Sequence, residues 1–376
     1  MPSLRTASVC PQPVGLSAAT LLLELLASVP DPRRPRGVRH SLPGLLAVAI
    51  AAVASGARSF AAIGQWVGDA DADLLASLGF RLGKGPSESA IRRAFGRMDA
   101  AKLDAVLGAW MWTRTRVVDQ RRVIAIDGKT IRGARTRNST APHLVAAYDH
   151  SHGVVLGQLA VAAKSNEIPA VRTLLASFDL AGVVVTVDAM HTQSDTAQLI
   201  VEAGGDYVFT VKANQPKLYA ACKALPWSDV PARRDTSKGH GRRVTRTIKV
   251  VTAPPWVELH GAAQVAQVRR TVTRNGRKTV EVVYLITSAD PRAASPTTLA
   301  SWVRGHWGIE NKLHWVRDVT YDEDRSQVRS GAGPQVMTTL RNLAISLLRL
   351  QGWTNIAHAL RHHAANNRRP LALLTT

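Results

Sequence analysis

Residues 123–127 read Val-Ile-Ala-Ile-Asp and residues 183–188 read Val-Val-Val-Thr-Val-Asp, two apolar runs that each end in an aspartate. Short runs rich in β-branched residues are typical of buried strands. An anionic side chain at the end of such a strand costs free energy unless a partner compensates it. If the two strands lie side by side, Asp127 and Asp188 meet at one edge of the sheet.

The segments around these runs predict the rest of the sheet. Further strands are expected at 143–148, 154–163 and 207–212, and amphipathic helices at 167–180 and 192–203. Three consecutive strands followed by alternating helices and strands indicate an α/β fold with a mixed sheet and helices packed on it.

Residues 31–115 have a helical pattern instead. Within them Ser87 is a candidate N-cap, and the helix that follows brings Arg92 and Arg93 close to Arg97. An arginine cluster on a short amphipathic helix is typical of a helix-turn-helix reader of DNA. A solvated basic face on a structural helix is the alternative, and the pattern does not decide between them.

The residue pattern changes again near Asp229. Residues 230–250 are rich in charge, and alternating runs follow at 245–251, 264–273 and 279–286, with the hairpin signal Asn275-Gly276 between the last two. A small β-rich insertion is therefore predicted. Helix resumes at Pro296, and a further helix is expected over 335–349.

The composition narrows the class of protein. Hydrophobic residues make up 45% of the 376, which is enough for a buried core, and 48 Lys and Arg against 27 Asp and Glu give a net charge of +21. This surplus favours a nucleic-acid partner, although arginine enrichment from a GC-rich genome would also raise it. Cys10 and Cys222 are too few for a disulfide framework, which favours a reducing compartment. The apolar run 42–57 is shorter than the roughly 20 residues that span a bilayer, so we expect a cytoplasmic protein that does not enter the membrane.

Carboxylates supply the candidate chemistry. Asp127 precedes a glycine and could simply cap a turn. Asp188 is not followed by a glycine, so a turn-capping role is a weaker explanation for it. Glu310 lies in a Trp- and His-rich helix, where its neighbours at helical spacing include His306, Trp307, Leu313, His314 and Arg317. Mg²⁺ is commonly held by carboxylates and phosphate oxygens, so these acids predict a site for a hard cation. In the same segment the pattern favours a core position for Trp315 and leaves Trp307 undecided.

The order of several blocks resembles the DDE transposases of bacterial insertion sequences, in particular the H-repeat-associated group. The blocks are DPRRPRGVRHSLPGLLAVAIAAVASG, IGQW, IAIDGKTIRGA, EIPAVRTLL, VTVDAMHTQ, GGDYVFTVKANQP, HGR, HWGIENKLHWVRDVTYDEDRS and LRNLAISLLR. They cover the chain from about Asp31 to Arg349.

The resemblance implies an RNase H-like catalytic core with Asp127, Asp188 and Glu310 as its acidic triad. These residues would hold two Mg²⁺ ions, with Mn²⁺ as a substitute, for strand cleavage and strand transfer on double-stranded DNA, at terminal inverted repeats and at target DNA. A homodimer in the synaptic complex and an association with the nucleoid are also implied. Candidates for DNA contact are Arg92, Arg93, Lys129, Arg132, Lys212, His306, Trp307, Lys312, His314 and Arg317.

This chain departs from the wider superfamily around its glutamate. Where that superfamily has a tyrosine, an arginine and a lysine, this chain has Val303, His306 and Arg317, so the DNA contacts of those residues do not carry over. Arg317 is the candidate replacement for the lysine, with a different grip on phosphate. An RNase H-like nuclease or resolvase, and a catalytically inactive relative that binds DNA ends, are the alternative functions.

The predicted division of the chain follows from these patterns. It comprises a leader (1–30), a helical N-terminal DNA-binding domain (31–116), the first part of the catalytic core (117–228), the β-rich insertion (229–292), the second part of the core with the helix of Glu310 (293–352) and a C-terminal tail (353–376).

Overall fold

The computed structural model describes residues 22–81, 84–118, 121–137, 140–162, 165–239 and 241–374. Its α-helices are α1 (Leu22–Leu26), α2 (Leu42–Ala54), α3 (Phe60–Gly68), α4 (Ala72–Ser77), α5 (Glu88–Arg97), α6 (Ala100–Arg114), α7 (Glu167–Leu175), α8 (Ser194–Glu202), α9 (Pro216–Lys223), α10 (Pro296–His306), α11 (Gly333–Leu350) and α12 (Ile356–Ala364). Most of the predicted leader, residues 1–21, lies outside the described residues. Within the described part of the chain, no helix combines the length and the apolar character needed to cross a membrane.

The strands form one nine-stranded sheet in the order β3-β2-β1-β4-β5-β9-β8-β7-β6. They are β1 (Arg122–Thr130), β2 (His143–Asp149), β3 (Val155–Ala160), β4 (Val183–Val187), β5 (Asp206–Val211), β6 (Arg233–Gly239), β7 (Arg242–Thr252), β8 (Gln264–Arg274) and β9 (Arg277–Thr287). The first three strands are antiparallel neighbours, and β1, β4 and β5 are parallel. This order and these directions are those of an RNase H-like sheet, so the predicted fold class is confirmed.

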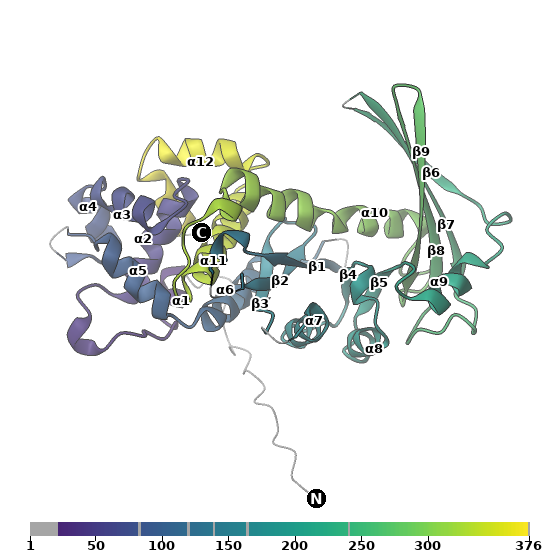
Figure 1. Cartoon of the computed structure of the whole chain (residues 1–376), viewed down its shortest axis with the longest axis horizontal. Coiled ribbons are helices and arrows are strands. Elements are labelled where there is room, and N and C mark those ends of the chain that lie inside the picture. The colour runs from purple at the N-terminus through teal and green to yellow at the C-terminus, as the bar shows by residue number, and fades with distance from the viewer. Residues whose placement is uncertain are drawn as a thin grey trace, which may run out of the picture.

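Helices pack on both faces of the sheet around β1, β3, β4 and β5 (Figure 1). Val123 and Val184 pack with Leu299 and Trp302 of α10 on one face. On the other face Gly157 of β3 faces Leu174 of α7, and α8 packs on β5. Because side chains alternate along a strand, the face toward α10 also receives Asp127 and Asp188.

The predicted β-rich insertion is real, but it is not a separate sheet. Its last strand, β9, pairs antiparallel with β5, so the insertion extends the central sheet. The fully exposed strand β6 falls in the charge-rich stretch where no strand is predicted. A strand exposed on both faces has no apolar alternation, so its sequence carries no periodic signal.

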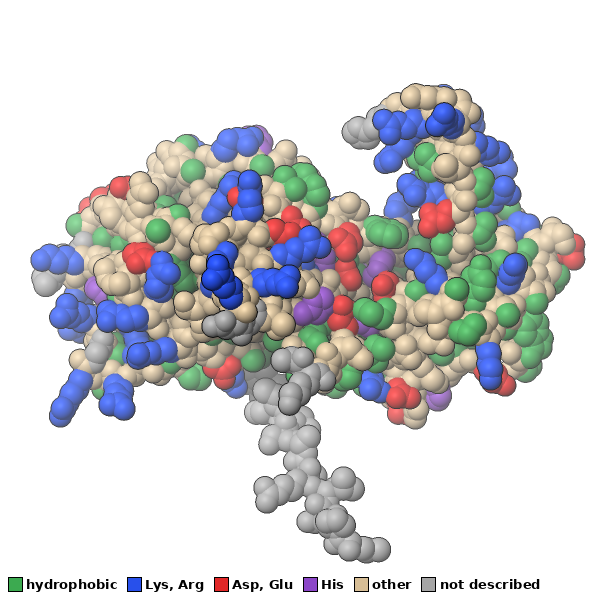
Figure 2. Space-filling view, viewed as in Figure 1, with side chains coloured by type: hydrophobic (Ala, Val, Ile, Leu, Met, Phe, Trp, Pro, Cys, Tyr) green, Lys and Arg blue, Asp and Glu red, His purple; other side chains and the backbone are tan. Residues whose placement is uncertain are grey.

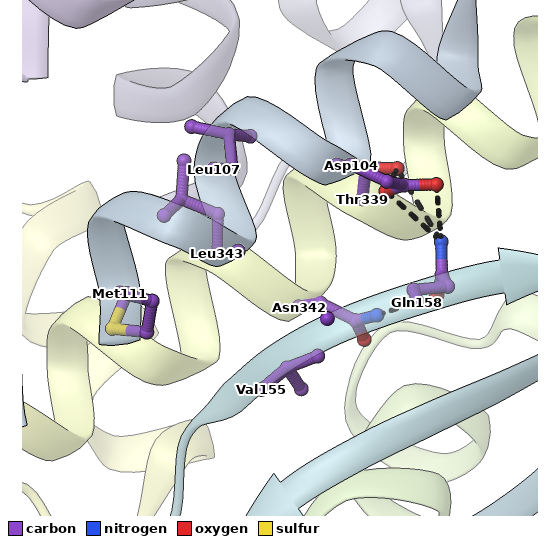
Figure 3. A pocket seen from close by; sticks show the side chains of 10 residues that line it. Asp104, Leu107, Met111, Val155, Gln158, Thr339, Asn342 and Leu343 are labelled. Atoms are coloured by element: carbon purple, nitrogen blue, oxygen red, sulfur yellow. Dashed lines mark hydrogen bonds between the residues drawn. The ribbon is translucent and has the colours of Figure 1, made fainter. Parts of the chain in front are cut away.

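The N-terminal helices and the sheet share one hydrophobic core. Helix α11 packs on α2 and α6, and α6 packs on β3. A buried polar cluster fastens this junction (Figure 3). There Asp104 of α6 accepts hydrogen bonds from Thr339 Oγ1 (2.6 Å), Gln335 Nε2 (2.8 Å) and Gln158 Nε2 (3.2 Å). The N-terminal helices and the sheet therefore pack against each other through one core. The domain boundaries at 116 and 292 stay predictions.

Candidate active site

Asp127 and Asp188 lie at the same edge of the sheet, on neighbouring parallel strands. The register pairs Ala125 with Thr186, and each aspartate comes two residues later on its own strand or just beyond it. Asp127 accepts a hydrogen bond from the Gly128 N–H (2.9 Å), and Asp188 accepts one from the Met190 N–H (3.0 Å). Both aspartates therefore cap turns. The sequence favours this role for Asp127 more than for Asp188, but the structure shows it for both.

The helix of Glu310 is not an ordinary α-helix. After α10 the chain continues as π-helical segments over Ile309–His314 and Val316–Thr320. The π-helix, with hydrogen bonds between residues i and i+5, is rare in proteins overall, but where it occurs it is often at a functional site. Positions 307, 311, 315 and 319 lie on the exposed side of this helix: Trp307 is 60% and Trp315 is 55% exposed. The core position favoured for Trp315 is wrong, because that expectation assumes an α-helical period.

The π-helical segment brings Glu310 and His314 onto Asp127. The buried His314 has its Nδ1 3.5 Å from Asp127 Oδ2 and 3.7 Å from Glu310 Oε1. One ligand atom from each of these three residues lies within 4.8 Å of the others. Asp188 stands at the same edge but is exposed and lies outside this tight group. In Figure 2 acidic and histidine side chains gather in the middle of the molecule, at this level.

In the group of Asp127, Glu310 and His314, the two carboxylates compete for one proton. Burial and the neighbouring Glu310 raise the pKa of Asp127, and Asp188 adds to the shift. The neighbouring His314 holds the pKa of Glu310 low. Burial lowers the pKa of His314, which keeps its imidazole neutral. A cation would stabilise Asp127 in its ionised form and replace the shared proton.

The donor set fits a divalent cation. Carboxylate oxygens are the preferred ligands of Mg²⁺ and Mn²⁺, and a neutral imidazole is a common ligand for transition metals. His314 was predicted as a DNA contact, but its burial and its position beside both carboxylates favour a role inside the site. The sequence signal for this role was the spacing of four residues from Glu310.

Two further histidines, His150 and His306, lie next to the acids, between α10 and the sheet. His306 Nδ1 is 3.0 Å and His150 Nε2 is 3.2 Å from Thr186 Oγ1, which itself donates to the Ile124 carbonyl (3.2 Å). Since the hydroxyl proton is used, both rings donate to this oxygen. Burial lowers the pKa of His306, and lowers that of His150 to about 3, so both imidazoles stay neutral. The predicted DNA contact His306 is therefore anchored at one ring nitrogen.

A polar network lies behind the site, on the opposite face of the sheet. Glu167 accepts a hydrogen bond from His143 Nε2 (2.7 Å) and another from His191 Nε2 (3.1 Å). A side chain at Gly128 would come within 2.4 Å of the Glu167 carboxylate, so the glycine after Asp127 makes room for this network. Burial opposes ionisation of Glu167, but the two histidines outweigh burial and lower its pKa. The sequence expectations assign it no role, although Glu167 opens the block EIPAVRTLL.

The remaining predicted DNA contacts divide by exposure. Arg132 is 77% exposed, and Arg93, Lys212 and Lys312 are also exposed. Arg92 forms an ion pair with Glu88. Lys129 is largely buried and donates to Asp318 Oδ2 (2.7 Å).

The prediction that Arg317 contacts a phosphate is wrong. Its side chain is 1% exposed and donates to Glu323 Oε1 from Nε (3.0 Å) and Nη2 (2.5 Å). The π-helical winding turns this position into the core, so the guanidinium serves the fold and does not face solvent.

Comparison with known proteins places the chain in a family. The model of the transposase DDE domain matches residues 119–347, and the model of the region associated with that domain matches residues 23–111. The chain therefore belongs to the DDE-domain transposase family, and the resemblance read from its blocks is confirmed.

Individual relatives agree. The chain is 33% identical over 344 residues to "H repeat-associated putative transposase YhhI" of Escherichia coli (strain K12), covering 87% of this chain and 90% of the relative. It is 34% identical over 241 residues to "H repeat-associated putative transposase YbfD" of the same organism, covering 62% of this chain and 94% of the relative. Among solved structures, a chain of the piggyBac transposase synaptic complex with hairpin DNA matches with a TM-score of 0.44 and 10% identity, over 91% of this chain and 78% of that one.

Proposed function

We propose that this DDE-family transposase acts on the ends of an insertion sequence, where it binds terminal inverted repeats, cleaves DNA strands and joins them to target DNA. The observation that carries the proposal is the group of Asp127, Glu310 and His314 at the edge of an RNase H-like sheet, with Asp188 on the adjacent strand. Family membership supports the transposition, and the side chains support metal-dependent chemistry at phosphorus.

Each acid has a distinct part in this proposal. Asp127 is rigid, since it ends a buried strand and is held by the Gly128 N–H. Glu310 and Asp188 are exposed and can meet a DNA phosphate. The neutral His314 lies beside both carboxylates without adding charge. Mg²⁺ or Mn²⁺ held by the three carboxylates would activate a water or a DNA 3′-hydroxyl and stabilise the leaving oxygen.

Exposed groups beside this edge supply the proposed contacts to DNA. Lys212 follows β5, Lys312 and Trp307 flank Glu310, and Arg132 follows β1. Cations grip the phosphates, and an exposed tryptophan offers a stacking surface for a base. The predicted dimer of the synaptic complex and the place of action at the nucleoid belong to the same proposal.

The test is strand cleavage of a labelled duplex that carries an inverted-repeat end, found by inspecting the DNA that flanks the gene. With Mg²⁺ the wild type should nick the end, and Asp188→Asn should cut at least about a hundredfold more slowly, because a lost metal carboxylate removes several kcal/mol of transition-state stabilisation. Asp195→Asn is the matched control, since Asp195 is an exposed aspartate of α8.

The outcomes separate the candidate functions. Equal cutting by wild type and Asp188→Asn would refute the site assignment. Binding of the end without cutting by either protein would favour the inactive DNA-binding relative. Cutting without joining to a second duplex would favour a nuclease or resolvase.

A further inference from the structure

The outer parts of β6, β7, β8 and β9 form an arm that projects beyond the helices (Figure 1). At the outer end β6 and β9 are exposed on both faces, and among the described residues there only Val244 is buried and Val272 and Thr273 are half-buried. Ordering a backbone costs about 1–2 kcal/mol per residue, which an uncovered single sheet does not recover by burial. The arm tip, residues 237–239, 241–244 and 272–279, therefore buries too little to be explained as a purely structural element.

Charge is the second unusual property of the arm tip. It holds Lys238, Arg242, Arg243, Arg274, Arg277 and Lys278, and its sequence contains no aspartate or glutamate. None of the six forms a salt bridge with any described residue. Figure 2 shows Lys and Arg side chains at this end of the arm, with acidic groups only nearer its base.

The strand register makes these charges costly. Arg274 of β8 lies directly opposite Arg277 on one side and Arg242 on the other, and Lys238 lies opposite Arg243. Like charges directly opposite each other destabilise a sheet.

The row at Arg246, three positions nearer the base than the row at Arg243, contains the neutralising acids that the tip does not have. There Arg246 and Arg270 lie opposite each other but are flanked by Asp235 and Glu281 in the same row. This row has no net charge, whereas every charged side chain in the two tip rows is a cation. A polyanion from outside would supply the missing negative charge.

The cations occupy both faces of the arm tip. Side chains alternate along a strand, so Arg242, Arg274 and Arg277 share the face that packs on α10 at its base. Lys238, Arg243 and Lys278 share the opposite face, whose base packs near α9. An element that lies flat on a duplex needs cations on one face only, whereas an element between two rows of phosphates needs them on both.

We propose that the arm tip inserts into a groove of double-stranded DNA, where its two faces contact the phosphates on the two walls. The major groove, about 12 Å wide, admits a two-stranded β-ribbon. The arm tip has four paired strands about 4.8 Å apart, so its width of about 14 Å runs along the groove and only the thickness of one sheet lies across it. This inference rests on the proposed function only in taking DNA as the ligand, and the surface is distinct from the carboxylate site.

The experiment measures binding of a labelled duplex of about 40 base pairs and arbitrary sequence, between roughly 50 and 200 mM salt. One variant is Arg242→Gln/Arg274→Gln/Arg277→Gln, and the second is Lys238→Gln/Arg243→Gln/Lys278→Gln. Each should weaken binding at least about tenfold and reduce the slope of log affinity against log salt by about 3, close to one per lost phosphate contact. A third variant with Arg→Lys at 242, 274 and 277 should retain most of the affinity, because it keeps the charge.

The charge-matched control is Lys102→Gln/Lys223→Gln/Arg361→Gln, which removes three exposed cations from α6, α9 and α12. Wild-type affinity in either face variant, or a loss no larger than that of this control, would overturn the proposal. A loss confined to one face would also overturn it, since that result means a flat contact.

Cleavage separates this inference from the proposed function. If the wild type cuts DNA and the face variants bind like the wild type, the arm inference alone fails. If the face variants lose binding as expected but no protein cuts with Mg²⁺, the proposed function alone fails.

Discussion

Glu323 and Asp127 are two carboxylates near the same π-helical segment, and they are held in opposite ways. Glu323 is fully buried, and its two oxygens accept from Arg317 and from Arg341 Nη1 (2.8 Å), with Thr338 Oγ1 also donating (3.0 Å). Burial alone would raise the pKa of Glu323, but the two guanidinium groups outweigh it and lower the pKa to about 2. Asp127 faces Glu310 and has a raised pKa because of burial and this like-charged neighbour.

The difference separates a structural carboxylate from a functional one. Glu323 has every partner it needs inside the chain, so its charge locks the segment after the π-helix onto α11. Asp127 and Glu310 have too little positive charge around them, which leaves room for a cation from outside. Asp104 is an intermediate case: it is buried without a cation, yet hydrogen bonds satisfy its oxygens (Figure 3).

The largest effect on stability is expected from Glu323→Gln. The variant leaves two buried guanidinium groups without a countercharge, and breaking a buried pair in this way costs about 3–5 kcal/mol. The free energy of unfolding, measured by urea denaturation at pH 7, should fall by this amount. Glu202→Gln, an exposed change on α8, should leave it within about 0.5 kcal/mol. Equal stability of the two variants would show that the ion triad does not hold the fold.

Asp104→Asn should change the pH dependence of stability. Burial raises the pKa of Asp104 to about 6 from 3.8, despite the hydrogen bonds from Thr339, Gln335 and Gln158. A raised carboxyl pKa stabilises the folded state below pH 4, and this stabilisation is lost as the pH rises to about 6. From pH 4 to pH 7 the wild type should therefore lose about 3 kcal/mol more of its unfolding free energy than Asp104→Asn does.

A constant difference across that range would mean that Asp104 titrates normally. Glu323 has the opposite sign: its lowered pKa contributes stability above about pH 4.5 that is lost as the pH falls toward 2.

Cation binding should depend on pH through Asp127. Because its pKa is raised, Asp127 must release a proton when a cation binds, so the affinity for Mn²⁺ should increase by up to about tenfold per pH unit below that pKa. Titration calorimetry in two buffers of different ionisation enthalpy measures the released proton directly. Asp127→Asn should bind more weakly and release no proton at this site. Proton release that is unchanged in Asp127→Asn would assign it to another group.

A smaller effect is expected from Glu167→Gln, behind the site. The amide removes one acceptor for His143 or His191, which should cost about 1–2 kcal/mol of stability. The fold and the carboxylate group remain, so Mn²⁺ affinity should change by less than about threefold, well below the effect of Asp127→Asn. A loss of Mn²⁺ affinity as large as that of Asp127→Asn would instead make Glu167 part of the cation site.

The spacing of apolar, turn-forming and capping residues predicted the elements that depend on neighbouring residues alone. The apolar strands that end in Asp127 and Asp188 were recognisable, as were the hairpin at Asn275-Gly276 and the capped helix after Ser87. The exposed strand β6 was not, because charges on both faces leave no alternation.

The tertiary contacts could not be predicted from pattern. Helical spacing predicts that His314 shares the face of Glu310, but its approach to Asp127 of β1 is a tertiary contact, and Arg317 turns inward because the helix is π-helical. Asp104 meets Thr339 across 235 residues, and no periodicity links positions that far apart.

The most direct test of the central claim compares Asp127→Asn and Glu310→Gln with Asp104→Asn in Mg²⁺-dependent cleavage of an element end. All three substitutions remove one carboxylate, and two of them remove a carboxylate with a raised pKa, but only Asp127 and Glu310 lie in the candidate site. We predict that cleavage falls at least about a hundredfold in the first two variants and stays within about threefold of wild type in folded Asp104→Asn. Cleavage that survives in Asp127→Asn and Glu310→Gln would contradict the account.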